Sequence, residues 1–190
     1  MRRLLLTVLT GLTVLMVLAM TSAADAAVFP FTTVRNNAIA VPSRCIGPFN
    51  RGSADGTPIV LMDCSQLWHG FAPVSSTDNS IRHSSEKCLS LANTQNPTPV
   101  GTSLVLRQCA NGPTGDQQWT FVAVHPGAPD GLWVLRQHFI GLCVGPSGGS
   151  TASGTRLVTQ NCAFAATTQQ WLLEGLPNRY GFSYDDGTTP

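Results

Sequence analysis

This 190-residue sequence has almost no lysine and almost no net charge. It holds one lysine, Lys87, against ten arginines, and its formal net charge is only +1. Proteins that bind nucleic acid or anionic membranes usually carry basic patches that attract phosphate groups. We therefore expect neither a nucleic acid nor an anionic membrane surface as the partner.

The sequence also lacks a convincing helical hydrophobic period and any metal-ligand spacing. Short apolar runs bounded by Gly, Pro, Ser and Asn recur instead, which is typical of an all-β barrel or sandwich. The four histidines, His69, His83, His125 and His138, are scattered along the chain. Structural zinc sites need ligands in close, regular spacing. The pattern predicts no metal site and no cofactor.

One long hydrophobic run is present, and it stands at the N-terminus. Arg2 and Arg3 precede 17 largely apolar, uncharged residues, and Ala24-Asp25-Ala26 then fits a signal-peptidase site. The run is slightly shorter than the ~20 residues of a membrane-spanning helix. We expect residues 1–26 to be a signal peptide and residues 27–190 to be one secreted, extracellular domain, free of the membrane after cleavage. An uncleaved anchor is the alternative.

All six cysteines lie after the expected cleavage site. An even number of cysteines in an exported chain indicates disulfides rather than metal ligands. The count alone leaves the pairing open.

The cysteines belong to a unit that occurs three times. Each copy has a first cysteine, a turn of small residues with Gly-Thr, an apolar strand, a second cysteine and then Gln-x-Trp. The expected strands are 59–61, 104–106 and 157–159, with further strands at 33–35, 80–82 and 133–136. The residues of the repeated motif are Gln66 and Trp68, Gln117 and Trp119, and Gln169 and Trp171. One such unit cannot bury its apolar face alone, so three are expected to pack around an axis.

This threefold arrangement of Cys, Gly-Thr turn, strand, Cys and Gln-x-Trp resembles the ricin-B-type lectin family over about residues 29–184. The resemblance implies a β-trefoil with twelve strands, in which a six-stranded barrel is capped by three hairpins. It implies repeats at about 29–75, 76–125 and 126–184, with the three tryptophans in the core and the three glutamines bound to backbone. It also implies one disulfide inside each repeat: Cys45–Cys64, Cys88–Cys109 and Cys143–Cys162.

Family lectins can hold one shallow sugar site in each lobe, and this sequence departs from the residues that build it. The family places an Asp two residues after the first cysteine, where this chain has Gly47, Ser90 and Gly145. The family's Gln position holds Val60, Val105 and Val158, and its aromatic position holds Met62, Arg107 and Gln160. The position before the motif glutamine holds Ser65, Asp116 and Thr168.

The middle lobe keeps the most polar chemistry, so the resemblance points to it as the sugar-binding lobe. Its candidate contacts are Ser90, Asn93, Arg107, Asp116 and Gln117. A carboxylate accepts hydroxyl donors strongly. In the first lobe, Phe49 or Asn50 could reach the equivalent pocket.

Two functions follow from these residues. The first is a secreted lectin-like protein with degenerate sites for a polysaccharide or glycoconjugate. The alternative is a trefoil that has lost sugar binding and contacts an extracellular protein, as an inhibitor, toxin subunit or envelope-associated factor. Enzymatic activity is not expected. The G-x-S-x-G match at residues 145–149 stands in a Gly/Ser-rich loop rather than at a strand-to-helix turn.

Overall fold

The computed structural model describes residues 32–38, 43–65, 70–73, 79–95, 98–112, 114–125, 131–174 and 184–185. Within these ranges the chain forms thirteen strands and three short 3-10 helices, η1 (Phe49–Arg51), η2 (Ser147–Gly149) and η3 (Thr167–Gln169). Four strands fall in each repeat and a last one follows: β1 (Thr32–Asn36), β2 (Arg44–Pro48), β3 (Ile59–Asp63), β4 (Gly70–Pro73); β5 (Ile81–His83), β6 (Lys87–Leu91), β7 (Leu104–Gln108), β8 (Trp119–Ala123); β9 (Leu132–Gln137), β10 (Cys143–Pro146), β11 (Leu157–Gln160), β12 (Gln170–Glu174); and β13 (Tyr184–Asp185).

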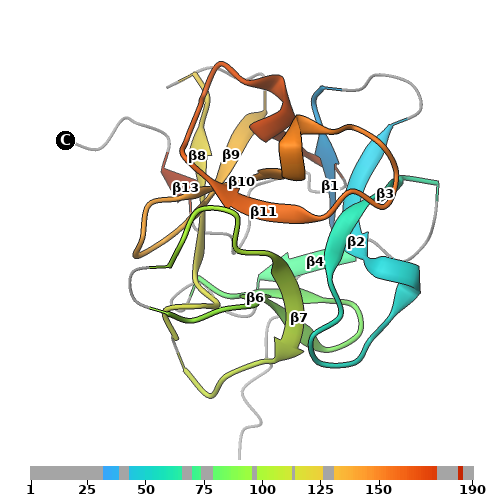
Figure 1. Ribbon diagram of the computed structural model, residues 1–190, viewed down its shortest axis with the longest axis vertical. Helices are drawn as coiled ribbons and strands as arrows, with labels where there is room; N and C mark the ends of the chain where they lie inside the picture. The colour runs from blue at the N-terminus through green and yellow to red at the C-terminus, as the bar shows by residue number, and fades with distance from the viewer. Residues whose placement is uncertain are drawn as a thin grey trace, which may run out of the picture.

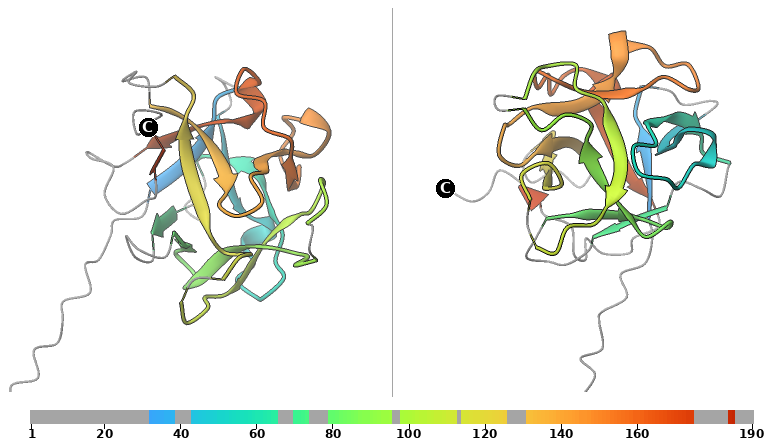
Figure 2. Two further views of the ribbon diagram at one scale, coloured as in Figure 1. Left: turned by 90° about the vertical axis from the view of Figure 1, so that its left-hand side faces the viewer. Right: turned by 60° about the horizontal axis from the view of Figure 1, so that its bottom comes forward.

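The first and fourth strands of the repeats close a barrel. Strand β1 pairs with β4 and β12, β4 pairs with β5, and β9 pairs with β8 and β12. A bridge between Ser80 and Gln118 joins the remaining two strands, β5 and β8. The three repeats occupy separate sectors, coloured blue to cyan, green to yellow, and orange to red (Figures 1 and 2).

The second and third strands of each repeat form a hairpin, β2–β3, β6–β7 and β10–β11. Bridges link the hairpins in a ring: Pro58 to Val105, Ser103 to Val158, and Arg156 to Val60. Figure 1 looks onto this cap, with β3, β7 and β11 around its centre. A closed six-stranded barrel capped by three hairpins is a β-trefoil, so the predicted all-β fold is confirmed.

The recurring Gly-Thr turn has a backbone cause. Gly56, Gly101 and Gly154 have φ values of +83°, +89° and +84°, which suit glycine far better than other residues. Their amides donate hydrogen bonds of 2.7–2.8 Å to the carbonyls of Leu106, Thr159 and Leu61, each on the neighbouring hairpin. The turn therefore starts the third strand and also joins the hairpins.

The core repeats the same pattern. The first cysteine of each repeat is followed by a buried Ile46, Leu89 or Val144, and the third strand begins with Ile59, Leu104 or Leu157. Trp119 and Trp171 are also buried, and their indole N–H groups donate to the carbonyls of Leu89 (3.0 Å) and Val144 (3.3 Å). These bonds satisfy the one polar atom that each ring brings into the core.

Each repeat is closed by its own disulfide, as the resemblance implied. The bonds are Cys45–Cys64, Cys88–Cys109 and Cys143–Cys162, with Cα–Cα distances of 5.0, 4.9 and 4.9 Å. Each closes a loop of about 20 residues, for which chain entropy predicts roughly 3 kcal/mol of stabilisation.

The predicted strands at 33–35, 59–61, 80–82, 104–106, 133–136 and 157–159 are present, although Ser80 makes only an isolated bridge before β5. The described chain adds β13, which pairs in parallel with β8 and makes a thirteenth strand. The expected signal peptide, Gln66 and Trp68 lie outside the described residues. The G-x-S-x-G match spans the end of β10 and the three-residue η2, with no α-helix after it in the described segment. No helix within the described ranges has the length and apolarity to cross a membrane.

Candidate functional site

The two motif glutamines within the described ranges, Gln117 and Gln169, are bound to the chain's own backbone. The amide of Gln117 donates to the carbonyl of Gln108 (3.0 Å) and accepts the N–H of Ala110 (3.0 Å). Gln169 makes the equivalent bonds, donating to the carbonyl of Asn161 (3.1 Å) and accepting the N–H of Ala163 (2.9 Å). Both side chains thus hold the residues on either side of the second cysteine, and the amide of Gln117 is already bonded there.

The family's polar positions lie on one face of each hairpin. In the middle lobe, Ser90 is directly opposite Val105, and Cys88 is directly opposite Arg107. The Ser90 side chain is 0% exposed, and its hydroxyl donates to a carboxylate oxygen of Asp116 at 2.8 Å. The backbone carbonyl of Asp116 accepts the N–H of Leu91 at 3.0 Å. Two bonds therefore fix Asp116 beside β6, while its side chain stays partly exposed.

Arg107 occupies the family's aromatic position and reaches along the same face. Its guanidinium donates to the carbonyl of Ala92 at 2.8 Å, two residues beyond Ser90. Because side chains at alternate positions of a strand share a face, Arg107 spans the face that carries Ser90. Asn93 uses its side-chain oxygen to accept the N–H of Gln95 at 3.0 Å. The structure thus brings Ser90 and Asp116 together, whereas Arg107, Asn93 and Gln117 bond to backbone.

In the third lobe, too, the chain's own side chains cover the hairpin face on which the family's site residues stand. Gln160, at the aromatic position, donates to the carbonyl of Pro146 (2.8 Å) and accepts from Gln169 (2.9 Å). It lies over Gly145, which occupies the family's Asp position. A Cβ atom at Gly145 would stand 3.0 Å from the Gln160 Oε1 atom and 3.0 Å from the Gln169 Cγ atom. A carboxylate could not enter this lobe unless those side chains moved.

The first lobe keeps an open pocket of about 400 Å³. Val60 and Met62, which replace the family's Gln and aromatic ring, line it together with Phe49, Asn50 and Arg51. Phe49 is 45% exposed. Asn50 and Arg51 have φ values of +50° and +58°. In the third lobe the equivalent positions are glycines, Gly148 and Gly149, with similar positive φ values. Phe49 and Asn50 are therefore placed at the pocket, as the sequence suggested.

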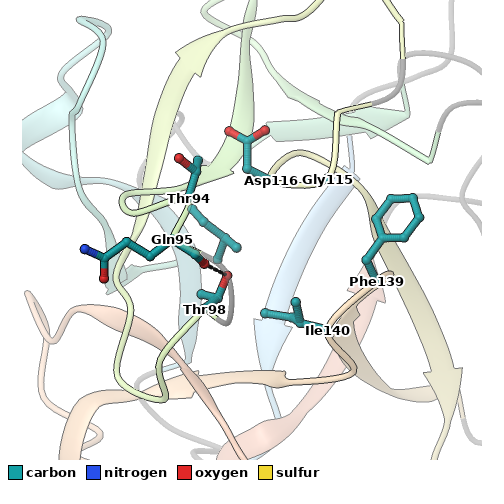
Figure 3. Close-up of a pocket in the computed structure, with 8 residues that line it drawn as sticks. Thr94, Gln95, Thr98, Gly115, Asp116, Phe139 and Ile140 are labelled. Carbon is teal, nitrogen blue, oxygen red and sulfur yellow. Dashed lines mark hydrogen bonds between the residues drawn. The ribbon is translucent and has the colours of Figure 1, made fainter.

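A larger pocket, of about 460 Å³, lies beside Asp116 (Figure 3). Its lining comes from three segments: the end of β6 with the loop that follows it, the turn before the Gln-Gln-Trp motif, and the turn between β9 and β10. The lining residues are Leu91, Thr94, Gln95, Thr98, Gly115, Asp116, Phe139 and Ile140. The pocket therefore joins the second repeat to the third.

The sequence pattern did not identify Phe139 and Ile140 as candidate site residues, although both line this pocket. They stand in the turn between β9 and β10, and Phe139 is 65% exposed, the most exposed large hydrophobic side chain in the described ranges. The available signal was two adjacent apolar residues in a segment bounded by His138 and Gly141. Nothing in the linear sequence placed that segment next to Asp116.

Comparison with known sequences decides the family. The sequence model of the ricin-type beta-trefoil lectin domain matches residues 31–171, well over half of the chain. The chain belongs to this family. No curated protein matches its sequence.

Solved structures show the same fold in other proteins of this type. The designed threefold-symmetric protein ThreeFoil aligns with a TM-score of 0.65 at 19% identity, over 77% of this chain and 99% of that chain. The Macrolepiota procera ricin B-like lectin, solved in complex with lactose, gives 0.59 at 16% identity, over 77% and 95%. An exo-β-1,3-galactanase from Clostridium thermocellum gives 0.62 at 17% identity, but only 30% of its length is covered.

Membership of the ricin-type lectin family supports a carbohydrate-binding role in general, and the family is generally non-catalytic. The disulfide-rich fold fits an extracellular protein. Among the described residues, no three His, Cys, Asp or Glu side chains gather in a way that could hold a metal ion.

Proposed function

We propose that this chain is a secreted carbohydrate-binding protein that holds its ligand at the middle lobe, through Asp116. All three lobes carry degenerate forms of the family's site, and the middle lobe keeps the most polar residues. The contact between Ser90 and Asp116, at 2.8 Å, carries this proposal.

The chemistry at Asp116 suits sugar hydroxyls. An ionised carboxylate accepts several hydrogen bonds, and those from hydroxyl groups are strong. Ser90 uses one oxygen of the carboxylate and fixes its direction, so acceptor sites remain for a ligand. The partly exposed side chain borders a pocket of about 460 Å³, which lies within the range of small-molecule sites. The lectin from Macrolepiota procera, a protein of the same fold, was solved with lactose.

A glycan array and a panel of insoluble polysaccharides test the proposal on the oxidised protein, residues 27–190. We expect binding that falls roughly tenfold in Asp116→Asn, because an amide oxygen is a weaker acceptor and its N–H₂ cannot accept. Glu86→Gln is the matched control, since Glu86 is an exposed carboxylate of the same lobe, paired with Arg82 on the surface. Absence of binding to every glycan, on a folded sample, would reject the proposal.

One observation favours the alternative, a trefoil that binds an extracellular protein. In two lobes the face that would hold the sugar is crossed by the chain's own side chains, Arg107 in the second and Gln160 in the third. If the glycan screens fail, the exposed rings of Phe49 and Phe139 become the first residues to change in tests of protein binding.

A further inference from the structure

We infer that the ligand-binding centre lies in the seam between the second and third repeats, where Phe139 stacks on one neutral hexopyranose ring. The site is the 460 Å³ pocket beside Asp116, displaced from the hairpin face on which the family's residues stand. The inference rests on the proposed carbohydrate function and adds the place, the ring contact and the charge of the ligand.

The turn that carries Phe139 is held in place from inside the protein. Gln137, which is 0% exposed, accepts the N–H groups of Phe139 and Ile140, each at 2.8 Å. Its amide also donates to the carbonyls of Gly115 and of Gln118, the latter at 3.2 Å. One buried side chain thus ties the β9–β10 turn to the segment that carries Asp116. The two walls of the pocket are therefore positioned relative to each other before any ligand arrives.

The ring of Phe139 is in contact with the protein on one side and open on another. His138 contacts it edge-on, with ring centroids 5.1 Å apart and an interplanar angle of 89°. His138 is itself anchored by the hydroxyl of Thr120 at 3.0 Å. Gly115 lies beside the ring, and a Cβ atom there would be 3.7 Å from the Phe139 Cδ2 atom. An aromatic ring that remains 65% exposed offers a flat apolar surface, and its few rotatable bonds keep the entropic cost of binding low.

The rest of the pocket has the mixed character that a sugar ring needs. Leu91 and Ile140 supply apolar surface, and Figure 3 shows the Ile140 side chain pointing into the pocket, across from Thr98. The Thr98 hydroxyl donates to the carbonyl of Gln95 at 3.0 Å, which leaves its oxygen able to accept. A hexopyranose has C–H groups on its faces and hydroxyls at its edge. The apolar wall and the polar rim therefore match a single ring.

The charge of the lining decides which sugars fit. Asp116 is the one charged residue among the eight that line the pocket, and Figure 3 shows its carboxylate at the rim, on the side away from Ile140 and Thr98. The rim therefore attracts hydroxyl donors and repels anions. A uronic acid or a sulfated sugar would meet this carboxylate without a compensating cation in the lining. The pocket of the first lobe differs, because Arg51 lines it and no acidic residue does. The seam pocket is thus the one suited to a neutral ring.

Methyl NMR reads this site directly. The chain has five isoleucines, Ile39, Ile46, Ile59, Ile81 and Ile140, so an isoleucine-methyl spectrum is simple and Ile140→Val assigns the reporter. The oxidised protein is titrated with D-glucose, D-galactose, D-mannose and D-glucuronate up to roughly 50 mM, and with any glycan positive on the array; this range detects millimolar affinity. We expect a saturable shift of the Ile140 methyl with a neutral hexose, and a much smaller one with D-glucuronate.

Two variants test the role of the Phe139 ring and the need for open space in the pocket. Phe139→Ala should weaken the affinity roughly tenfold, the loss expected for one stacking contact. Phe164→Ala, which removes another partly exposed ring (38%) outside the pocket, should leave it unchanged. Gly115→Leu should block the pocket, because its side chain starts beside the Phe139 ring, where a Cβ atom meets only an ordinary van der Waals contact at 3.7 Å. Its thermal unfolding, measured beside that of the wild type, shows that the variant is folded.

The outcomes separate this inference from the proposed function. If a glycan binds but the Ile140 methyl does not move and Phe139→Ala binds equally well, the seam site is wrong and the lectin function stands. Loss of that same binding in Phe49→Ala would then place the site in the first lobe. If no glycan binds the folded protein, both the function and the seam site are wrong.

Discussion

Ser90 donates its hydroxyl hydrogen to Asp116 at 2.8 Å, although 26 residues separate the two in the chain. Ser90 stands on β6, and Asp116 stands in the turn before the Gln-Gln-Trp motif. In family lectins the first of these positions carries an Asp that contacts the ligand itself. Here a serine takes that place and bonds to the second residue instead. In the site that we propose, the carboxylate that contacts the ligand therefore stands on the neighbouring turn rather than on the strand.

The Ser90→Ala variant tests whether the Ser90 hydroxyl orients the Asp116 carboxylate. The Ser90 hydroxyl is 0% exposed, and its removal takes one donor from the carboxylate of Asp116. We expect a loss of roughly 1–2 kcal/mol in the free energy of unfolding, measured by urea denaturation. Glycan affinity should fall as well, because the carboxylate is no longer directed.

A matched control for Ser90→Ala is Ser150→Ala. The Ser150 hydroxyl is exposed and contacts only surface groups, the Thr155 hydroxyl at 3.0 Å and the Ala152 N–H at 3.3 Å. Its removal should change the free energy of unfolding by no more than about 0.5 kcal/mol. Equal effects of the two variants would show that the contact between Ser90 and Asp116 contributes nothing specific.

A pair of substitutions in the third lobe tests whether Gln160 fills the place of a family ligand. Gly145→Ala should cost roughly 1–3 kcal/mol of stability, because its Cβ would stand 3.0 Å from the Gln160 Oε1 atom. In the Gln160→Ala background the same change should cost less by at least about 0.5 kcal/mol. The relief is partial, since the Gln169 Cγ atom is equally close.

Chemical denaturation of the wild type, both single variants and the double variant measures this coupling. Gly115→Ala serves as the control glycine, because its new Cβ would meet only an ordinary contact at 3.7 Å and should change stability little. Strict additivity of Gly145→Ala and Gln160→Ala would mean that Gln160 does not occupy the space above Gly145.

The fold could be predicted because its signals are local and occur three times. Each cysteine pair lies within about 20 residues, and each Gly-Thr turn and Gln-x-Trp motif marks the same place in its repeat. The structure gives these signals physical causes: a left-handed glycine before the third strand, and a glutamine that bonds to the backbone on both sides of the second cysteine. Local chemistry of this kind can be read from the sequence, because each residue acts on neighbours a few positions away.

The candidate site could be located from the sequence only in part, because it depends on contacts between repeats. Asp116 was identified from its position before the motif glutamine. Phe139 lies 24 residues beyond Gly115, and the pairing of β8 with β9 and the bonds of Gln137 bring the two segments together. Arg107 and Gln160 stand at a ligand position in the sequence, yet in the structure both turn to backbone carbonyls. The direction of a long side chain depends on which hydrogen-bond acceptor is nearest in space, and the linear sequence does not reveal which acceptor that is.

The ion pair between Asp55 and Lys87 makes one part of the stability depend on pH. The Lys87 Nζ atom lies 2.8 Å from a carboxylate oxygen of Asp55 and 3.0 Å from the side-chain oxygen of Gln108. The hydrogen bond from Lys87 holds the pKa of Asp55 below its ordinary value. A carboxyl whose pKa is lower in the folded state stabilises the fold above its unfolded pKa, and this contribution is lost as the pH falls through the folded value. The pair joins the first repeat to the second, so its loss should loosen that junction in acid.

Carboxyl NMR titration and thermal unfolding measure this effect. In wild-type protein the Asp55 midpoint should lie below that of an ordinary Asp, and Lys87→Met should raise it, because Lys87 is the largest cause of the shift. The Tm of Asp55→Asn should lie below that of the wild type at neutral pH, with the difference vanishing as the pH falls through the Asp55 pKa. Because Asp55 is exposed to solvent, added salt should shrink the same difference. A midpoint that is the same in wild type and Lys87→Met would show that the pair does not form in solution, and the pH dependence would then have to come from another carboxylate.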